Sequence, residues 1–267
     1  MQHQPRKRFG QNFLHDPAVI QRIVNAIQPQ ADQHLVEIGP GQGAITTHLI
    51  DRCSKLDVIE LDRDLISGLH TVSQANHFHI HNADALRFEF CSLVEKDEKL
   101  RLLGNLPYNI STPLLFHLLK QAECIHDLHF MLQREVVERI VAAPGSKTYG
   151  RLSVAIQARC SSEMLFLIGA GAFKPVPKVE SAIVRLTPDI NAIRAIRYPQ
   201  MLDQLLQQAF SQRRKIALNS LKKSVDAPML EAVAIDPTAR AEVIPVSSYV
   251  QLANLVGDRK RDMMEQQ

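Results

Sequence analysis

The stretch His34-Leu-Val-Glu-Ile-Gly-Pro-Gly-Gln-Gly43 joins a short apolar run to a glycine-rich turn. The apolar run predicts a buried strand, and residues 44–50 predict a helix directly after the turn. Glycines let the backbone approach a ligand closely, and a helix start offers free N–H groups. The spacing is G-x-G-x-G, whereas dinucleotide sites use G-x-G-x-x-G, and Glu37 stands two residues before Gly39. This pattern is typical of S-adenosylmethionine sites and indicates a nucleoside cofactor.

Two further strand ends carry acidic residues. Residues 55–60 predict a strand that ends in Glu60, 21 residues after Gly39, where a carboxylate can accept both ribose hydroxyl groups. Residues 76–81 predict a third strand that leads to Asp84, which can bind the amino group of an adenine. Glu60 also fits a helix N-cap or a solvated strand end, and Asp84 also fits the N-cap of the next turn. Because the carboxyl ends of parallel strands meet at one edge of a sheet, we expect these residues to share one site.

The segment Asn105-Leu106-Pro107-Tyr108 follows a predicted strand over residues 100–104 and precedes a predicted helix over residues 111–120. The lone pair of an adenine amino group is delocalised into the ring, so the nitrogen is a poor nucleophile. The Asn105 side-chain oxygen and the Leu106 carbonyl can each accept one N–H of that amine, which frees the lone pair. Pro107 stiffens the turn, and Tyr108 offers a stacking face. Taken alone, the four residues also fit an ordinary strand-to-helix loop.

Together these motifs resemble a known family, the KsgA-type adenine dimethyltransferases of small-subunit ribosomal RNA. The resemblance covers nearly the whole chain, from Arg8 to the basic segment near Arg213, and the motifs are long and ordered. The matching motifs are Arg8-Phe-Gly-Gln-Asn12-Phe-Leu14, Glu37-Ile-Gly-Pro-Gly-Gln-Gly43, Glu60, Asp84, Gly104-Asn-Leu-Pro-Tyr-Asn-Ile-Ser111, Gln133-Arg-Glu-Val136, Tyr149-Gly-Arg-Leu-Ser153 and Phe173-Lys-Pro-Val-Pro-Lys-Val-Glu-Ser181.

The resemblance implies methyl transfer from S-adenosylmethionine to N6 of two adjacent adenosines in a hairpin loop near the 3′ end of small-subunit rRNA. It implies cofactor contacts at Asn12, Leu14, Gly39, Glu60, Asp84 and Asn105, and the glycine-rich turn adds Gly41. The catalytic set is then Asn105, Leu106, Pro107 and Tyr108, together with Phe173, which can stack on the target base opposite Tyr108. Phe173 also fits a hydrophobic plug beneath a proline-rich loop.

The positive charge of the chain is concentrated in a few segments. The net charge is +3, and the residues from Arg194 onwards contain 11 Lys and Arg against 8 Asp and Glu, which accounts for this excess. Phosphate contacts need local basic clusters and not a high total charge. The sequence therefore predicts RNA contacts at Arg6, Lys7, Arg8, Lys174, Lys178, Arg213, Arg214, Lys215, Lys222 and Lys223. Each cluster also fits a solvated protein face.

The order of predicted elements indicates an α/β fold, a Rossmann-like methyltransferase sheet with a small all-helical C-terminal domain. We expect a catalytic, cofactor-binding domain over residues 1–193 and an RNA-binding helical domain over residues 194–267. Within the first, the pattern predicts helices at 17–28, 134–141 and 150–159, and strands at 125–132, 163–168 and 180–186. Within the second, it predicts helices at 200–210, 213–222, 228–233 and 247–256 and a fraying tail at 258–267.

The remaining composition favours a cytoplasmic protein. The four cysteines (Cys53, Cys91, Cys124 and Cys160) are far apart and form no C-x-x-C motif, so we expect reduced thiols, with no disulfide framework and no zinc site, and we expect Cys124 and Cys160 to be buried. His77, His79 and His81 alternate along one predicted strand, but methyl transfer needs no metal and we expect none to bind there. No signal peptide and no apolar run long enough to cross a membrane is evident.

Two other functions fit parts of the pattern. The related family that methylates large-subunit rRNA shares several motifs, although the segments 8–14 and 173–181 favour the small-subunit family. A noncatalytic RNA-binding assembly factor could retain the fold, but the intact Asn105–Tyr108 turn argues against this function. The expected partners are small-subunit rRNA and the immature small ribosomal subunit, with no obligate protein partner evident.

Overall fold

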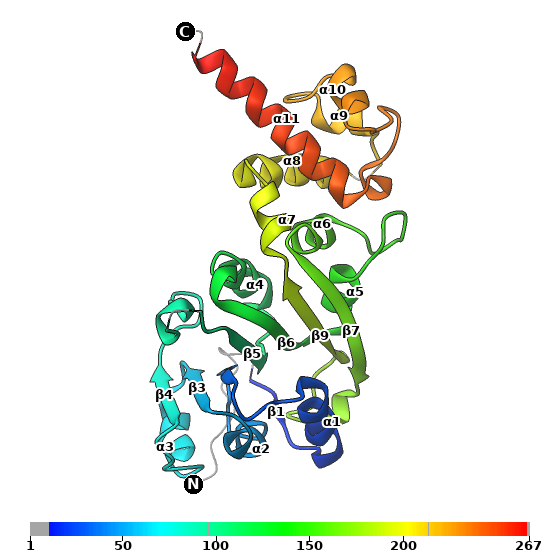
Figure 1. Ribbon diagram of the computed structural model, residues 1–267. Coiled ribbons are helices and arrows are strands. Elements are labelled where there is room, and N and C mark those ends of the chain that lie inside the picture. The colour runs from blue at the N-terminus through cyan, green and yellow to red at the C-terminus, as the bar shows by residue number, and fades with distance from the viewer. Residues whose placement is uncertain (1–10, 96, 213, 266–267) are drawn as a thin grey trace. The chain divides into compact units, whose positions relative to one another are not determined.

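The computed structural model describes residues 11–95, 97–212 and 214–265, which form two compact units (Figure 1). The first unit contains the described residues up to Val137 together with Glu163–Pro188. The second contains Glu138–Ser162 and the described residues from Asp189 onwards. The second unit is therefore larger than residues 194–267, because a helix at Arg151–Gln157 packs against the C-terminal helices.

The first unit is built on a seven-stranded mixed sheet. Its strands are β2 (His34–Ile38), β3 (Lys55–Glu60), β4 (Phe78–Asn82), β5 (Leu100–Asn105), β6 (Ile125–Gln133), β7 (Cys160–Ile168) and β9 (Ser181–Pro188). They lie in the order β4-β3-β2-β5-β6-β9-β7, with β2 to β6 parallel and β9 antiparallel to β6. The chain leaves β2 towards β3 and returns on its other side as β5. Ligands of open α/β sheets bind at such a switch point.

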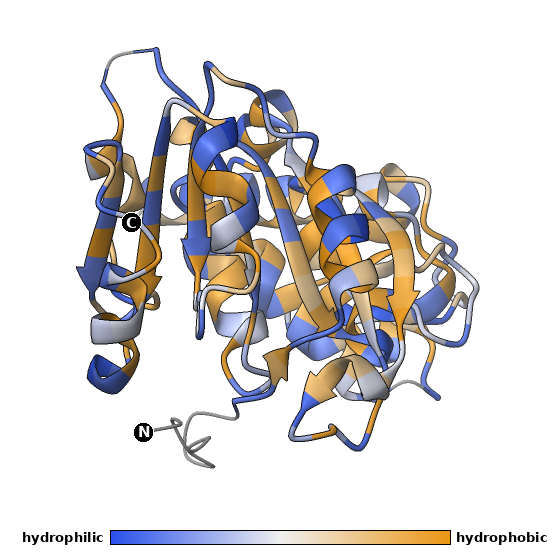
Figure 2. Ribbon diagram, turned by 90° about the horizontal axis from the view of Figure 1, so that it is seen from below, coloured by the Kyte–Doolittle hydropathy of each residue, from blue (hydrophilic) through white to orange (hydrophobic). Residues whose placement is uncertain are grey.

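Helices cover the sheet in this unit. They are α1 (Pro17–Ile27), α2 (Thr46–Leu49), α3 (Arg63–His70), α4 (Ser111–Leu119) and α5 (Arg134–Ile140). As the sequence predicts, α1 begins at Pro17 because the Asp16 carboxylate accepts the backbone N–H groups of Ala18 and Val19. Its apolar face, Ile20, Ile23, Val24 and Ile27, packs in one core with Leu35 and Leu103. The strands show as largely apolar in Figure 2.

A buried ion pair ties α1 to the sheet. The Arg101 guanidinium donates to both carboxylate oxygens of Asp127, at 3.0 and 2.8 Å. The same guanidinium donates to the backbone carbonyls of Ile27 and Gln28 at the end of α1, at 2.7 and 3.2 Å. Arg101 is 8% and Asp127 6% exposed, so the pair satisfies helix-end carbonyls that have no partner in the helix itself.

The second unit is helical, as expected for its C-terminal part. Its helices are α6 (Arg151–Gln157), α7 (Ile190–Ala195), α8 (Pro199–Ser211), α9 (Ala217–Leu221), α10 (Ala227–Ala232) and α11 (Val246–Glu265). Helix α8 packs against α6, α9 and α11. The hydroxyl group of Tyr149, from one of the family motifs, donates to the Ile244 carbonyl at 2.9 Å, which joins the loop before α6 to the start of α11.

Two helix boundaries in the second unit differ from the prediction. The helix expected over 213–222 begins at Ala217, because Ile216 forms an isolated bridge with Arg240 and is held in an extended conformation. The tail expected to fray from residue 258 is instead helical to Glu265. The Arg261 Nε atom lies 3.8 Å from the Glu265 Oε1 atom, four residues later on α11. Such ion pairs stabilise an exposed helix end.

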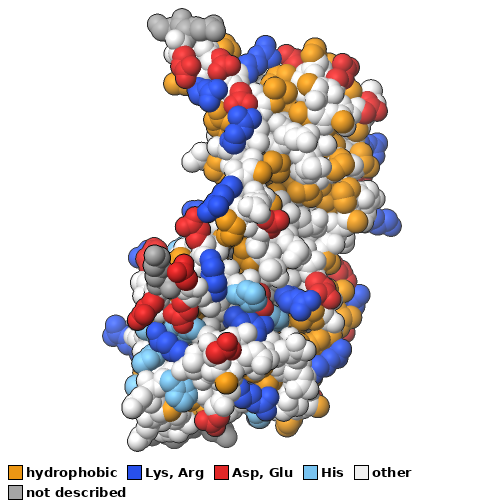
Figure 3. Space-filling view, viewed as in Figure 1, with side chains coloured by type: hydrophobic (Ala, Val, Ile, Leu, Met, Phe, Trp, Pro, Cys, Tyr) orange, Lys and Arg blue, Asp and Glu red, His pale blue; other side chains and the backbone are white. Residues whose placement is uncertain are grey.

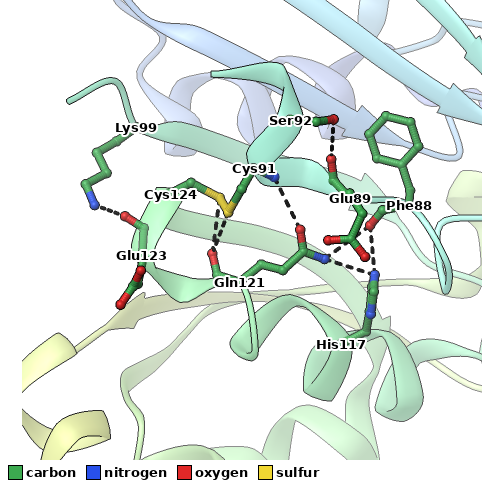
Figure 4. Close-up of a disulfide and its surroundings, with 9 residues drawn as sticks. All are labelled: Phe88, Glu89, Cys91, Ser92, Lys99, His117, Gln121, Glu123 and Cys124. Carbon is green, nitrogen blue, oxygen red and sulfur yellow. Dashed lines mark hydrogen bonds between the residues drawn. A yellow bond between two sulfur atoms is a disulfide. The ribbon is translucent and has the colours of Figure 1, made fainter. Parts of the chain in front are cut away.

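The expectation that all cysteines are reduced is wrong for one pair. Cys91 and Cys124 form a disulfide with 5.5 Å between their Cα atoms (Figure 4). The residues lie 33 positions apart, but the short turns that precede β5 and β6 bring them together, and no local spacing reveals this. The Cys91 N–H donates to the Gln121 side-chain carbonyl at 3.2 Å beside the bridge. Cys53 and Cys160 are free, as expected, and both are buried.

We expect Arg101→Ala to lower the free energy of unfolding by about 3–5 kcal/mol, because the change leaves the Asp127 carboxylate buried without its partner. Urea unfolding followed by circular dichroism measures the loss. Arg185→Ala is the matched control, since Arg185 pairs with Glu163 at an exposed site and we expect a change below about 1 kcal/mol. Equal losses for the two variants would contradict the structural role of Arg101.

Candidate active site

One cavity of about 260 Å³ opens at the carboxyl ends of β2, β3 and β5. It brings together the strand-end residues that the sequence singles out. Its lining includes Asn12, Leu14, Gly39, Gly41, Glu60, Asp84, Asn105, Leu106, Pro107 and Tyr108. Residues as far apart as 12 and 108 in sequence therefore share one site within the first unit.

The glycine-rich turn forms one wall of this cavity. Gly39 has φ +68° and Gly41 has φ +59°, values that side-chain-bearing residues rarely adopt. A Cβ atom on Gly41 would lie 3.1 Å from the Phe13 ring, so the absence of a side chain also lets residues 11–14 pass close to the turn. The backbone, with no side chain between, therefore faces the cavity on this side.

Glu60 is held in place before any ligand arrives. Its two carboxylate oxygens accept the backbone N–H groups of Gly41 at 3.2 Å and Asp62 at 2.8 Å. Glu60 is 7% exposed, and burial raises its pKa, while these two hydrogen bonds act in the opposite direction. The side chain is thus fixed at the end of β3, with further lone pairs on each oxygen that can accept hydrogen bonds from a ligand.

Asp84 also lies at the cavity, in the turn after β4. One of its carboxylate oxygens accepts the Leu86 N–H at 3.0 Å. This contact is the capping role that the sequence left open as an alternative. Because Asp84 and Leu86 both line the cavity, the capping bond fixes the carboxylate beside the space that a ligand would occupy.

Glu37 is a second buried carboxylate in the wall. It is 2% exposed and accepts the Thr46 hydroxyl group at 2.6 Å. Burial raises its pKa from 4.5 to about 7, and the nearby Glu60 carboxylate adds to the rise. A carboxyl group with this pKa is partly ionised at neutral pH. Because Glu37 lines the cavity, its ionised form would stabilise a cationic group of a ligand there.

The segment 11–14 crosses the cavity and is fixed at three points. The Gln11 side-chain amide donates to the Asp62 carboxylate at 3.0 Å. Strand β1 (Phe13–Leu14) pairs antiparallel with β8 (Phe173–Lys174). Between these points, the Asn105 side-chain N–H group donates to the Asn12 carbonyl at 2.9 Å. Because a carbonyl can only accept, this contact fixes the amide of Asn105 with its nitrogen towards Asn12 and its oxygen available for another donor.

Tyr108 is anchored to the start of β9. Its hydroxyl group and that of Ser181 lie 3.1 Å apart, and either can donate. Ser181 is 1% exposed and pairs with Gln133 at the end of β6. The backbone N–H of Leu106 donates to the Met131 carbonyl of β6 at 3.2 Å. The turn Asn105–Tyr108 is therefore held by β6, by β9 and by the segment 11–14.

Phe173 does not join this cavity. It is 1% exposed and packs in the core with Leu14 and Ile183, so in this structure it has the plug position that the sequence left open as an alternative. The burial follows from the pairing of β8 with β1, which sets Leu14 opposite Phe173. In the described structure, Tyr108 is the aromatic side chain of the predicted catalytic set that faces the cavity.

The predicted RNA-binding residues fall into three groups. Lys174, the last residue of β8, and Lys178, in the loop after it, are exposed in the first unit. Arg214, Lys215, Lys222 and Lys223 are exposed around α9, in the second unit. Arg6, Lys7, Arg8 and Arg213 lie outside the described residues. On the face that Figure 3 shows, Lys and Arg side chains occur as separate spots and not as one continuous patch.

Sequence reasoning missed several residues that shape the site. Gln11 and Asp62 contact each other over 51 positions, and Ser181 contacts Tyr108 over 73 positions, so no local pattern reveals them. The sequence marks Glu37 as an acidic residue at a strand end, but its burial beside Glu60 follows only from the three-dimensional structure. Among residues 11–95, 97–212 and 214–265, no cluster of His, Cys, Asp and Glu could hold a metal ion. In the same residues, no helix is long and apolar enough to span a membrane.

Comparison with known proteins identifies the family. The model of the family described as ribosomal RNA adenine dimethylase matches residues 2–258. The chain belongs to this family. It is 53% identical over 258 residues to ribosomal RNA small subunit methyltransferase A of Pseudomonas aeruginosa, covering 96% of each chain. It is also 53% identical over 258 residues to the protein of that name from Hydrogenovibrio crunogenus, covering 95% of this chain and 97% of the other.

Solved structures support the fold. A dimethyladenosine transferase from Plasmodium falciparum matches with a TM-score of 0.78 at 24% identity, over 92% of this chain and 98% of that one. The 23S rRNA methyltransferase ErmE matches with a TM-score of 0.70 at 23% identity, over 92% of this chain and all of that one. The predicted fold class and the predicted family resemblance are therefore confirmed.

The pKa of Glu37 gives the ligand-free protein a pH-dependent stability. The folded protein keeps the Glu37 proton up to about pH 7, whereas the unfolded chain loses it near pH 4.5, so stability falls as the pH rises through this window. We expect Glu37→Gln to remove this loss and to raise the free energy of unfolding at pH 8 by up to about 3 kcal/mol. Urea melts of both proteins at pH 5 and pH 8 measure the effect. A variant with the same pH dependence as the parent would contradict it.

Proposed function

We propose that the chain transfers methyl groups from S-adenosylmethionine to N6 of two adjacent adenosines in a hairpin loop near the 3′ end of small-subunit rRNA. The observation that carries this proposal is the cavity in which the turn Asn105–Tyr108 meets the fixed carboxylates of Glu60 and Asp84. Membership of the rRNA adenine dimethylase family supports the reaction, and identity of about half with proteins named for the small subunit supports the target. The reaction would take place in the cytoplasm, on immature small subunits.

The residues of the cavity fit S-adenosylmethionine. Glu60 would accept the ribose hydroxyl groups, and Asp84 would accept the adenine amino group. Gly39 and Gly41 leave room for the nucleoside, and Asn12 and Leu14 close the cavity from the N-terminal side. Glu37 lies deeper in the wall, where its negative form would favour the positive charge of the cofactor. When bound, the cofactor supplies an electrophilic methyl group on its sulfonium.

The turn after β5 would activate the target amine. The Asn105 side-chain oxygen points away from the Asn12 contact and would accept one N–H of the adenine amino group. The Leu106 carbonyl would accept the other N–H. Two acceptors on one amine favour a tetrahedral nitrogen and so a free lone pair for attack, and they form most strongly in the transition state. Tyr108, held by Ser181, would stack on the flipped base.

The alternatives are weaker on specific grounds. A structure named for 23S rRNA shares the fold, so the fold does not choose between the two rRNAs, but the relatives that are 53% identical are named for the small subunit. A noncatalytic assembly factor has no need for an amide oriented towards the cavity or for a carboxylate fixed by two N–H groups.

The deciding experiment follows labelled methyl groups from S-adenosylmethionine to immature small subunits and maps the modified nucleotides. We expect two adjacent dimethylated adenosines near the 3′ end of the small-subunit rRNA. Large-subunit rRNA, offered in parallel, should remain unlabelled. Label on the large subunit would favour the related family, and cofactor binding without label on either rRNA would favour an assembly factor.

We expect Asn105→Ala to lower the single-turnover rate of methyl transfer by about 10²–10³, because a preorganised acceptor is lost. RNA binding should stay nearly unchanged. Asn105→Asp is an informative companion, since it keeps acceptor oxygens but cannot donate to the Asn12 carbonyl, and we expect it to lose activity as well. A rate within a few-fold of the parent for Asn105→Ala would show that the residue is only structural.

The basic residues around α9 give a prediction for RNA binding. We expect the combined change of Arg214, Lys215, Lys222 and Lys223 to Gln to weaken subunit binding and flatten its salt dependence, by about 0.7–0.9 in log–log slope per lost phosphate contact. Cofactor affinity, measured by calorimetry, should not change. Lys120→Gln, an exposed lysine after α4, serves as the control. An unchanged slope would mean that the residues around α9 are only solvated.

A further inference from the structure

The loop between β8 and β9 exposes apolar side chains in an unusual position. Val176 is 67% and Val179 44% exposed, two of the few large hydrophobic residues with such exposure among those described. We call these two side chains the apolar tip. They lie within one six-residue connection between Lys174 and Ser181, and Pro175 and Pro177 restrict its backbone. Isolated exposed apolar residues are common, but a stiff loop that presents two together needs an explanation.

Both ends of this loop are fixed to the catalytic unit. At its start, β8 pairs with β1, which lines the cavity. At its end, the Glu180 carbonyl accepts the Arg134 N–H at 3.0 Å, and the Arg134 guanidinium donates to the Glu180 carboxylate at 2.8 Å. The next residue, Ser181, contacts the Tyr108 hydroxyl group. The apolar tip therefore belongs to a loop held against the elements that shape the mouth of the cavity.

The charges of the loop favour an anionic partner. Lys174 and Lys178 are exposed on either side of Val176, while the acidic Glu180 is paired with Arg134. Phe173, the aromatic residue of β8 just before the loop, is buried in the core and does not reach the surface. The loop thus presents aliphatic side chains between two cations, a combination that suits the bases and phosphates of a nucleic acid.

We propose that the apolar tip, Val176 and Val179, is a wedge that enters the RNA next to the target adenosine and takes the place of its stacked neighbour. The inference rests on the proposed function and adds to it the group that keeps the base out of its stack. A base must leave its stack to react in a cavity, and this costs free energy that an inserted apolar side chain offsets. Lys174 and Lys178 would hold the phosphates on either side of the gap.

The test uses the double variant Val176→Ser/Val179→Ser, with Val243→Ser as matched control, because Val243 is 49% exposed but lies in the other unit. The first probe is a protein-free RNA hairpin with 2-aminopurine at a target position, whose fluorescence rises on unstacking. The second readout is single-turnover methylation of small-subunit rRNA, with either a normal base or an abasic site beside the target. Cofactor affinity, measured by calorimetry, reports that the variants are folded.

We expect the double variant to lose most of the fluorescence rise and to methylate normal rRNA about tenfold more slowly, but to come within about twofold of the parent beside an abasic site, where no stack needs breaking. The control should match the parent throughout. Equal rates for parent and double variant on normal rRNA would overturn the wedge while leaving the proposed function intact. Slower methylation of ribosomal particles by the double variant, with an unchanged fluorescence rise on the hairpin, would also overturn the wedge, since the apolar tip would then contact a ribosomal protein. No methylation by the parent would instead refute the proposed function.

Discussion

The close approach of β5 to β2 is the constraint on which the first unit depends. A Cβ atom on Gly104 would lie 2.3 Å from the Ile38 carbonyl, so any other residue there would push the strands apart. This approach occurs at the switch point of the sheet and sets Asn105 directly beside the turn at Gly39. The glycine-rich turn after β2 and the turn Asn105–Tyr108 after β5 can share one cavity only because these two strands end side by side.

The sequence predicts well what depends on short-range pattern. The strand that ends in Glu60 has the predicted bounds, α1 begins at the predicted cap, and the polar strand ends meet in one cavity. Prediction from the sequence fails where a contact with a residue far away in the chain determines the local structure. Because Ile216 forms a bridge with Arg240, α9 begins only at Ala217. The turns before β5 and β6 lie together, which brings Cys91 next to Cys124. The motif around Phe173 fits both a stacking residue and a hydrophobic plug, and only the pairing of β8 with β1 shows that its side chain lies in the core.

Orientation, more than residue identity, distinguishes an active site from a similar loop. The side-chain amide of Asn105 can take two orientations, with its nitrogen and oxygen exchanged. The Asn-Leu-Pro-Tyr sequence has no defined chemical role until one of the two is fixed. The Asn12 carbonyl decides between them, since only the amide nitrogen can donate to it. Likewise, the N–H groups of Gly41 and Asp62 turn the Glu60 carboxylate into a fixed acceptor. The contacts that give the site its chemistry are thus mostly made by backbone groups, which sequence motifs describe only indirectly.

The two-stranded pairing of β1 with β8 has a thermodynamic consequence. One of these strands lines the cavity, and the other begins the loop that carries Lys174 and the exposed valines. Any ligand that restrains residues 12–14 therefore also restrains the start of that loop, and a ligand that restrains the loop acts on the cavity to the same extent. If ligands bind at both places, their binding would then be cooperative, and linkage requires the coupling free energy to be equal in both directions. A pair of two-residue strands would let the enzyme sense whether its two substrates are present together.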